Sequence, residues 1–220
     1  CSSDLMENAK TGLNTKIHIV GFILMAIAGW IDTIALYVCL SENSSFLTGR
    51  VAKLGHFIIN SEKANAIEVT TIIVFFIVGA CISALLTQKA GLSFGLYFSA
   101  GLIVLTLIWF YTTQASTIAY ITLPMSMGGQ NAATSLTSIN RTTHLTGPIT
   151  DIGTSLAKGN FKQALFWILR VLGFLAGAAA ACYFTSKEVG LFYLLIAPAV
   201  VICAIAFFQK RFLIIPVIAD

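Results

Sequence analysis

Charged side chains are scarce in this sequence. Only 10% of the 220 residues are Asp, Glu, Lys or Arg, whereas a soluble domain carries about 25%. The chain therefore lacks the charge to cover itself with a hydrated surface. Apolar residues make up 57% of it, and several apolar runs exceed the roughly 18–20 residues that cross a bilayer. The sequence predicts an all-α polytopic membrane protein. The net charge of +4 fits the basic excess of cytoplasmic loops, so nucleic-acid binding is not expected.

Groupings of catalytic or metal-binding residues are also lacking. The five cysteines form no C-x-x-C pair, and the three histidines lie far apart with no partner at ligand spacing. There is no Ser/His/Asp set in register, no phosphate-binding loop and no paired carboxylates in one motif. We therefore expect no metal, no cofactor and no enzymatic activity. Most of the cysteines lie in apolar runs and are interpreted as small packing residues. The residues concerned are Cys1, Cys39, Cys81, Cys182, Cys203, His18, His56 and His144.

The segment 1–16 is polar and has no apolar stretch of the kind found in a signal peptide. Cys1 could be the lipid-modified start of a mature bacterial lipoprotein, or the incidental end of a chain fragment. Six spans are predicted after this segment, and a tail follows at 209–220. The spans are placed at 17–38, 66–86, 91–111, 115–136, 163–183 and 188–208.

An even number of spans places both termini on one side of the membrane. Eight basic residues go with that side: Lys10, Lys16, Lys89, Arg141, Lys158, Lys162, Lys210 and Arg211. Four go with the other: Arg50, Lys53, Lys63 and Lys187. Both termini are therefore predicted to be cytoplasmic.

The two long connections, 39–65 and 137–162, match when the sequence is shifted by 98 residues. The aligned residues are Ser44 to Gly49 with Thr142 to Gly147, Phe76 with Phe174, and Gly79 with Gly177. Each half, 17–111 and 115–208, contains three spans, so the second copy must enter the membrane from the opposite side. The sequence predicts a 3+3 inverted repeat. Transporters built from such repeats have their substrate site near the middle of the membrane.

Each long connection contains a Thr-Gly pair followed by a stretch suited to a short helix. A helix is predicted near 146–158, with Thr146 as its cap and Pro148 in its first turn. Twelve residues rise roughly 18 Å, about half a bilayer, and a matching helix is predicted near 48–60. We expect both to be re-entrant half-helices whose N-termini meet near the midplane. The alternative is that both connections are amphipathic loops on the membrane surface.

Polar side chains at membrane depth are the candidate pathway residues. Asp32 lies inside the first span, where a carboxylate costs roughly 2.5–3.5 kcal/mol. It aligns with Gln130, which Asn131 follows. Asp32 is a candidate proton or cation site, or it reaches interfacial water or pairs with Arg50. Asp151, on the second half-helix, either pairs across the repeat or faces a vestibule.

The fifth span contains two further features. Arg170 interrupts its apolar run, and we expect this side chain to extend toward the cytoplasm rather than act as a gating charge. Gly173 and Gly177, with the alanines at 178–181, form a small-residue face for close helix packing. This face could pack within the chain or between subunits, and it is the reason for expecting a homodimer.

At these motifs the sequence resembles the YoaK family of bacterial integral membrane proteins, which is defined by a domain of unknown function. The shared motifs are Gly29 to Asp32, Thr48-Gly49, Gly128 to Asn131 and Thr142 to Gly147. The resemblance covers residues 20–208 and implies a bacterial cytoplasmic (inner) membrane protein with no assigned activity. Arg50 stands where the family has Asn, and this fixed positive charge would favour an anionic solute.

The leading hypothesis is a secondary transporter or channel-like permease for a small solute or ion, with its pathway at the repeat interface. Asp32 would carry a proton or cation, and Arg50 would tune charge selectivity. The alternative is a non-transporting scaffold in which the Thr-Gly segments are packing devices. The remaining pathway candidates are Thr48, Gly49, Gln130, Asn131, Thr146, Gly147 and Asp151.

Overall fold

The computed structural model describes residues 2–39, 44–113, 115, 117–209 and 217. Cys1 and most of the tail at 209–220 lie outside the described residues. Within them the chain forms eight α-helices, and α1 continues into a π-helical turn, η1 (Ala35–Cys39). The α-helices are α1 (Ser2–Ile34), α2 (Leu47–Ile59), α3 (Lys63–Ala90), α4 (Leu92–Thr113), α5 (Ala119–Ser135), α6 (Thr146–Ala157), α7 (Phe161–Ser186) and α8 (Leu191–Phe208). The all-helical fold is confirmed, as expected where backbone groups must be paired within each segment.

In the described part of the chain, five helices are long and apolar enough to cross a membrane: α3, α4, α7, α8 and the part of α1 from Thr15 to Tyr37 with η1. The fourth predicted span, 115–136, corresponds to α5, which is shorter at 17 residues. The polar segment at the N-terminus is not separate from the first span, because α1 begins at Ser2. Gly91 alone joins α3 to α4, and its φ of 91° suits a residue without a Cβ.

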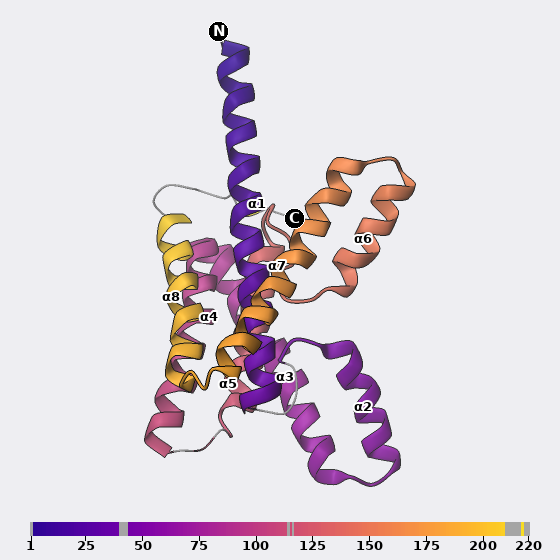
Figure 1. The fold of residues 1–220 in the computed structure, drawn as a ribbon, viewed down its shortest axis with the longest axis vertical. Coiled ribbons are helices and arrows are strands. Elements are labelled where there is room, and N and C mark those ends of the chain that lie inside the picture. The colour runs from indigo at the N-terminus through magenta and orange to yellow at the C-terminus, as the bar shows by residue number, and fades with distance from the viewer. Residues whose placement is uncertain (1, 40–43, 114, 116, 210–216, 218–220) are drawn as a thin grey trace.

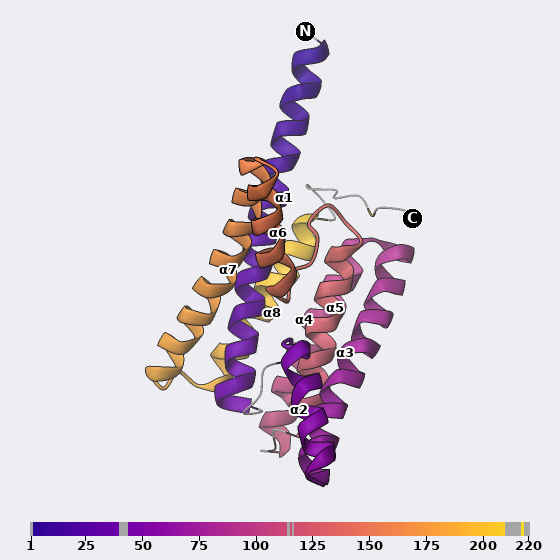
Figure 2. The same cartoon turned by 90° about the vertical axis from the view of Figure 1, so that its right-hand side faces the viewer.

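The long helices run roughly along one axis, and the two short helices lie to one side of them (Figure 1). α1 starts at the same end of the bundle where α8 finishes. α2 forms a hairpin with the start of α3 at the opposite end, and α6 forms one with the start of α7 near the N-terminal end. Figure 2 shows that α2 and α6 begin near the middle of the bundle and run away from each other.

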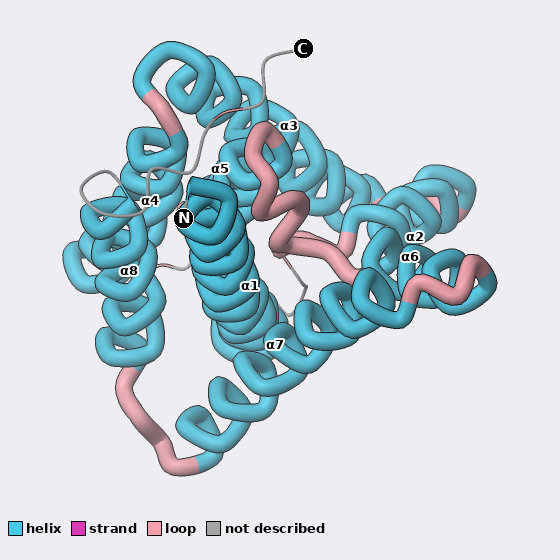
Figure 3. The backbone as a smooth tube through the Cα atoms, turned by 90° about the horizontal axis from the view of Figure 1, so that it is seen from above, coloured by secondary structure: helices cyan, strands magenta, loops and turns pink. Residues whose placement is uncertain are grey.

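Two helix pairs dominate the packing of the bundle. α1 packs most extensively against α7, and α3 against α5, whereas α4 packs about equally against α8 and α5. Seen from above, α1 lies inside the ring of the other long helices (Figure 3). Its inward face supplies fully buried residues such as Leu24, Ala28 and Ile31 to the hydrophobic core, where they meet Leu96 and Leu195.

Glycines allow the closest of these helix contacts. A Cβ on Gly177 of α7 would lie 1.8 Å from the carbonyl oxygen of Ala26 on α1, and one on Gly29 would lie 2.1 Å from that of Phe174. Gly173 likewise faces the Phe22 carbonyl oxygen on α1. The glycines of the small-residue face on α7 therefore pack within the chain.

Arg170 is held inside the protein rather than extending toward a membrane surface. Its side chain is only 1% exposed. One guanidinium nitrogen donates to the carbonyl oxygens of Ile139 at 3.0 Å and Ile17 at 3.4 Å, and the group stacks 4.7 Å from the Phe166 ring centre. A Cβ on Gly21 would lie 1.5 Å from the guanidinium, so this glycine provides the space. Arg170 thus links α7 to α1 and to the loop before α6.

Candidate functional site

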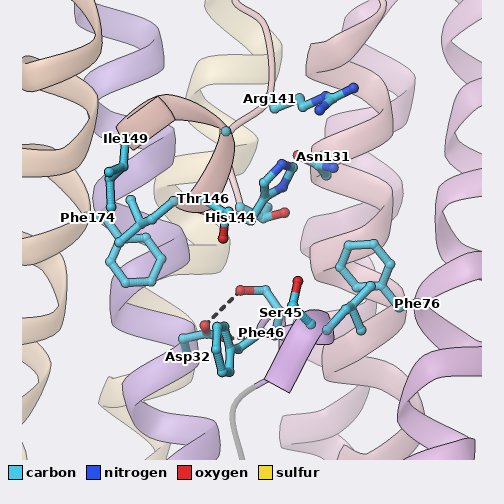
Figure 4. A pocket seen from close by; sticks show the side chains of 15 residues that line it. Asp32, Ser45, Phe46, Phe76, Asn131, Arg141, His144, Thr146, Ile149 and Phe174 are labelled. Carbon is cyan, nitrogen blue, oxygen red and sulfur yellow. Dashed lines mark hydrogen bonds between the residues drawn. The ribbon is translucent and has the colours of Figure 1, made fainter. Parts of the chain in front are cut away.

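A pocket of about 660 Å³ lies between the starts of the two short helices. Figure 4 shows that side chains from both halves of the chain line this pocket. Asp32, Ser45 and Phe46 lie on one side of it, and His144 and Thr146 lie on the other. The residues that line it are Asp32, Ser45, Phe46, Leu47, Thr48, Phe76, Asn131, Arg141, Thr143, His144, Leu145, Thr146, Gly147, Ile149 and Phe174.

Most lining residues occur as pairs separated by the same distance in sequence. At a separation of 98 residues these pairs are Ser45 with Thr143, Phe46 with His144, Leu47 with Leu145, Thr48 with Thr146, and Phe76 with Phe174. Asp32 and Asn131, which also line the pocket, are separated by 99. The two halves of the chain therefore contribute matched positions to one cavity.

Asp32 anchors the chain just before α2. Its Oδ1 accepts from the Ser44 N–H at 2.9 Å, the Ser44 hydroxyl at 2.7 Å and the Ser45 N–H at 2.8 Å. Its Oδ2 accepts from the Ser45 hydroxyl at 2.7 Å. The carboxylate is 4% exposed, and four donors compensate its burial. Asp32 is thus a tether that holds the start of α2 against α1.

The second half has an analogous but uncharged tether before α6. Asn131 Oδ1 accepts from the Thr142 N–H at 3.3 Å. Gln130 Nε2 donates to the Thr142 hydroxyl at 3.2 Å and to the Leu24 carbonyl oxygen at 3.0 Å. The Thr142 hydroxyl also pairs with that of Thr134 at 3.0 Å. Amide and hydroxyl groups here take the place of the carboxylate and the two serines.

The two short helices, at Leu47–Ile59 and Thr146–Ala157, lie within one residue of the predicted stretches near 48–60 and 146–158, but Thr146 does not have the predicted role. Thr146 is not the cap of α6, because the helix already includes it and the residue before it, Leu145, supplies no side-chain cap. A threonine caps only from non-helical backbone, whereas the Thr146 backbone is already helical. Thr48 is the second residue of α2. Both threonines instead line the pocket in the first turn of their helices.

The electrostatic balance at the α6 end of the pocket is positive. Arg141 lies at its rim, above His144 and Asn131 (Figure 4). Burial lowers the pKa of His144 below its usual 6.5, and the nearby Arg141 charge lowers it further. His144 is therefore neutral at pH 7, and Arg141 supplies the fixed charge. The helix dipole adds about half a positive charge at the start of α6.

The pocket brings together only part of the predicted set. Asp32, Thr48, Asn131, Thr146 and Gly147 line it. Four predicted residues do not: Gly49, Arg50, Gln130 and Asp151.

The residues outside the lining have other surroundings. A Cβ on Gly49 would lie 2.1 Å from the Phe46 ring, so this glycine lets the ring pack over α2. Arg50 is 1% exposed. Gln130 is fully buried, and its Nε2 donates to Thr142 in the loop before α6. Asp151 is partly exposed on α6.

Sequence reasoning missed several lining residues. Phe76 and Phe174 appeared only as matched positions of the repeat, and that match was the available signal for their role. Thr143 and His144 belonged to the matched motif but were not assigned to the site. Arg141 directly precedes that motif and was considered only as a loop charge.

Comparison with known proteins places the chain in a family without assigning an activity. Neither a curated protein nor a solved structure matches it. Residues 20–208 match the family described as protein of unknown function (DUF1275); this finding does not itself carry the YoaK name. Because the match covers most of the chain, this helical, membrane-type protein belongs to the DUF1275 family.

Proposed function

We propose that this protein is a membrane permease for a small solute, with six crossings arranged as a 3+3 inverted repeat. Its pathway runs through the pocket between the starts of α2 and α6. The observation that carries the proposal is the pairing of the lining residues, because both halves contribute matched positions to one cavity. Transporters with inverted repeats place their sites at such an interface.

The sixth crossing is α5. Its 17 residues rise about 25 Å, close to the roughly 30 Å hydrocarbon core. It lies along α3 and α4 inside the bundle, and α4 runs along it in the opposite direction (Figure 2). With α5 included, α1 and α8 leave the membrane on the same side.

The packing supports an inverted repeat. If α1, α2, α3 and α4 correspond to α5, α6, α7 and α8, the pair α1–α7 becomes α5–α3, and α4–α8 becomes itself. The first two, α1–α7 and α3–α5, are the two most extensive helix pairs of the bundle.

The glycine contacts follow the same exchange. Gly29 meets the Phe174 carbonyl oxygen as Gly128 meets that of Phe76, each at 2.1 Å. Gly29 and Gly128 are 99 residues apart, and the same separation makes Asn131 the counterpart of Asp32.

The short helices have the geometry that a permeation site requires. Their N-termini meet at the pocket, and their first N–H groups have no partner within the helix. Non-helical backbone at membrane depth is stable only where protein or water satisfies it. Asp32 and Asn131 satisfy part of it, and a water-filled pocket would satisfy the rest.

The topology completes the proposal. From the distribution of basic residues we infer that both termini lie in the cytoplasm of a bacterial cell and that the protein is multi-pass in the inner membrane. The α6 hairpin would then lie toward the cytoplasm and the α2 hairpin toward the outside. A homodimer stays a prediction, although the glycines that suggested it pack against α1.

The test is water access to the two helix starts. We would replace Thr48 and Thr146, one at a time, with cysteine in a cysteine-free chain reconstituted in membranes. A membrane-impermeant maleimide would then be applied from each side. We expect both positions to react, because both line the pocket and a pathway must be hydrated.

Matched controls use exposed positions of the same helices that lie outside the pocket lining. Val51 on α2 and Thr150 on α6 are exposed but do not line the pocket, so cysteines there should react less than those at positions 48 and 146. Protection of Thr48 and Thr146 from both sides would mean a dry packing device and would move the protein to the scaffold class. Equal labelling of all four positions would indicate ordinary surface loops.

A further inference from the structure

The two ends of the pocket differ at one matched place. In the first half, the Asp32 carboxylate sits before α2 and accepts from the Ser45 hydroxyl through Oδ2. In the second half, the neutral amide of Asn131 stands at the corresponding position of α5. The first short helix therefore has a carboxylate built in before its start, and the second has none.

A hydroxyl of the second half has no hydrogen-bond partner among the described residues. Thr143 corresponds to Ser45, lines the pocket and is 0% exposed. Its Oγ1 has no hydrogen-bond partner among the residues that the structure describes. A buried hydroxyl without a partner costs free energy, so a group that accepts from Thr143 would be stabilised there.

The charges around Thr143 indicate which group this is. Arg141 and the start of α6 are positive, whereas Asp32 lies at the α2 end of the pocket (Figure 4) and accepts there from Ser44 and Ser45. An added anion would be attracted at the α6 end, and an added cation would find no carboxylate among the residues that line that end. Phe76 and Phe174 face each other across the cavity (Figure 4) and suit an apolar body.

We propose that the pocket binds a small carboxylate with an apolar body. Its carboxylate accepts from the Thr143 hydroxyl and lies near Arg141 and the first turn of α6. There it occupies the place that Asp32 fills in the first half. This assignment rests on the proposed permease function, because it names the solute class of the same pocket.

The experiment measures binding of radiolabelled benzoate at pH 7 to the full-length protein in phosphatidylcholine nanodiscs. Benzamide, a neutral molecule of nearly the same shape, serves as the control ligand, and empty discs give the partition background. We expect saturable binding of benzoate and none of benzamide. If both bind equally, or neither binds saturably, the proposal is wrong.

Substitutions then test the location of the site. Thr143→Val should weaken benzoate binding about tenfold or more, because it removes a hydrogen bond to a charged group. Thr143→Ser should retain binding, and Thr154→Val makes the same substitution at an exposed position of α6 and should have no effect. Asn131→Asp should abolish binding by supplying an internal carboxylate. Because Thr143→Ser and Asn131→Asp are conservative, the site can be judged even if Thr143→Val fails to fold.

Further measurements distinguish a small solute from a lipid phosphate as the bound anion. They also test the carboxylate site and the permease function separately. Loss of benzoate binding on adding phosphatidylglycerol would assign the site to a lipid phosphate and overturn the small-solute assignment. Binding that obeys the substitutions, without benzoate flux in proteoliposomes, would uphold the site and contradict the permease. Labelling of Thr48 and Thr146 cysteines without benzoate binding would leave the permease standing and overturn the carboxylate.

Discussion

Asp32 and Asn131 occupy matched places beside the pocket, and the difference between a carboxylate and an amide changes how each short helix is attached. Asp32 gathers two hydroxyls and two N–H groups from consecutive serines. Asn131 takes one N–H, and Gln130 supplies a second contact to the same threonine. The start of α2 is therefore held by one carboxylate, whereas the start of α6 is held by several neutral side chains that meet at Thr142.

Truncating Asp32 tests this tether. Asp32→Ala leaves four buried donors without an acceptor, and we expect it to lower the free energy of unfolding by about 2–4 kcal/mol, because one hydrogen bond to a charged group contributes about 1.5–3 kcal/mol. Asp32→Asn should cost less, since three of the four bonds converge on Oδ1 and an amide oxygen can keep them. Unfolding of the purified protein in detergent would measure both.

Asp151→Ala is the control for that comparison, because its side chain is partly exposed on α6. A loss in Asp32→Ala no larger than in Asp151→Ala would refute the tether. Since Asp32→Asn keeps most of it, this variant also suits the question of a coupling proton. Loss of pH-driven uptake in a stable Asp32→Asn protein would then report on charge rather than on folding.

At the scale of the helices, glycines set how closely the two principal pairs approach. Gly79 meets the carbonyl oxygen of Met125, and Gly177 meets that of Ala26. Backbone lies against backbone at both crossings, so neither contact can be relieved by moving a side chain. The crossings also position Phe76 and Phe174, which lie three residues before these glycines and face the pocket.

Alanine at either crossing should destabilise the bundle. A Cβ would lie 2.1 Å from the Met125 oxygen in Gly79→Ala and 1.8 Å from the Ala26 oxygen in Gly177→Ala. We expect losses of about 1–3 kcal/mol, typical of overpacking. Gly101→Ala, where a Cβ would meet nothing within 4 Å, should be neutral or slightly stabilising, as helical Gly→Ala changes without a clash are. Equal unfolding midpoints for all three variants would contradict this account of the crossings.

The positions of most helices could be predicted from the sequence. The exact residue-by-residue match between the helices of the two halves could not. Bilayer thickness fixes the length of a span, so apolar runs located the long helices, and the Thr-Gly repeats located α2 and α6. The loop alignment matched Asp32 with Gln130, whereas the glycine contacts match it with Asn131. One residue turns a helix by about 100°, which is enough to move a side chain out of the pocket. Such a shift depends on helix packing and leaves no trace in loop motifs.

At the scale of the whole molecule, the sequence predicted that polar groups from both halves would meet, but not which ones line the pocket. Depth along a span can be read from sequence, whereas the direction of a side chain requires the neighbouring helices. Arg50 and Asp151 lie at appropriate depth yet do not line the pocket. Arg170, expected to reach a membrane surface, is enclosed because Gly21 leaves space for it.

The arrangement of the halves leads to a prediction about assembly. α1 packs on α7 and α3 packs on α5, so each half buries its main helices against the other half and has no complete core alone. Fragments 1–114 and 115–220 expressed together should co-purify, and each expressed alone should be degraded. Gly79→Leu in the first fragment should abolish co-purification by colliding with the Met125 backbone, whereas Gly101→Leu should not. A half that accumulates as a stable monomer would show a self-contained domain, and the intertwined repeat would be wrong.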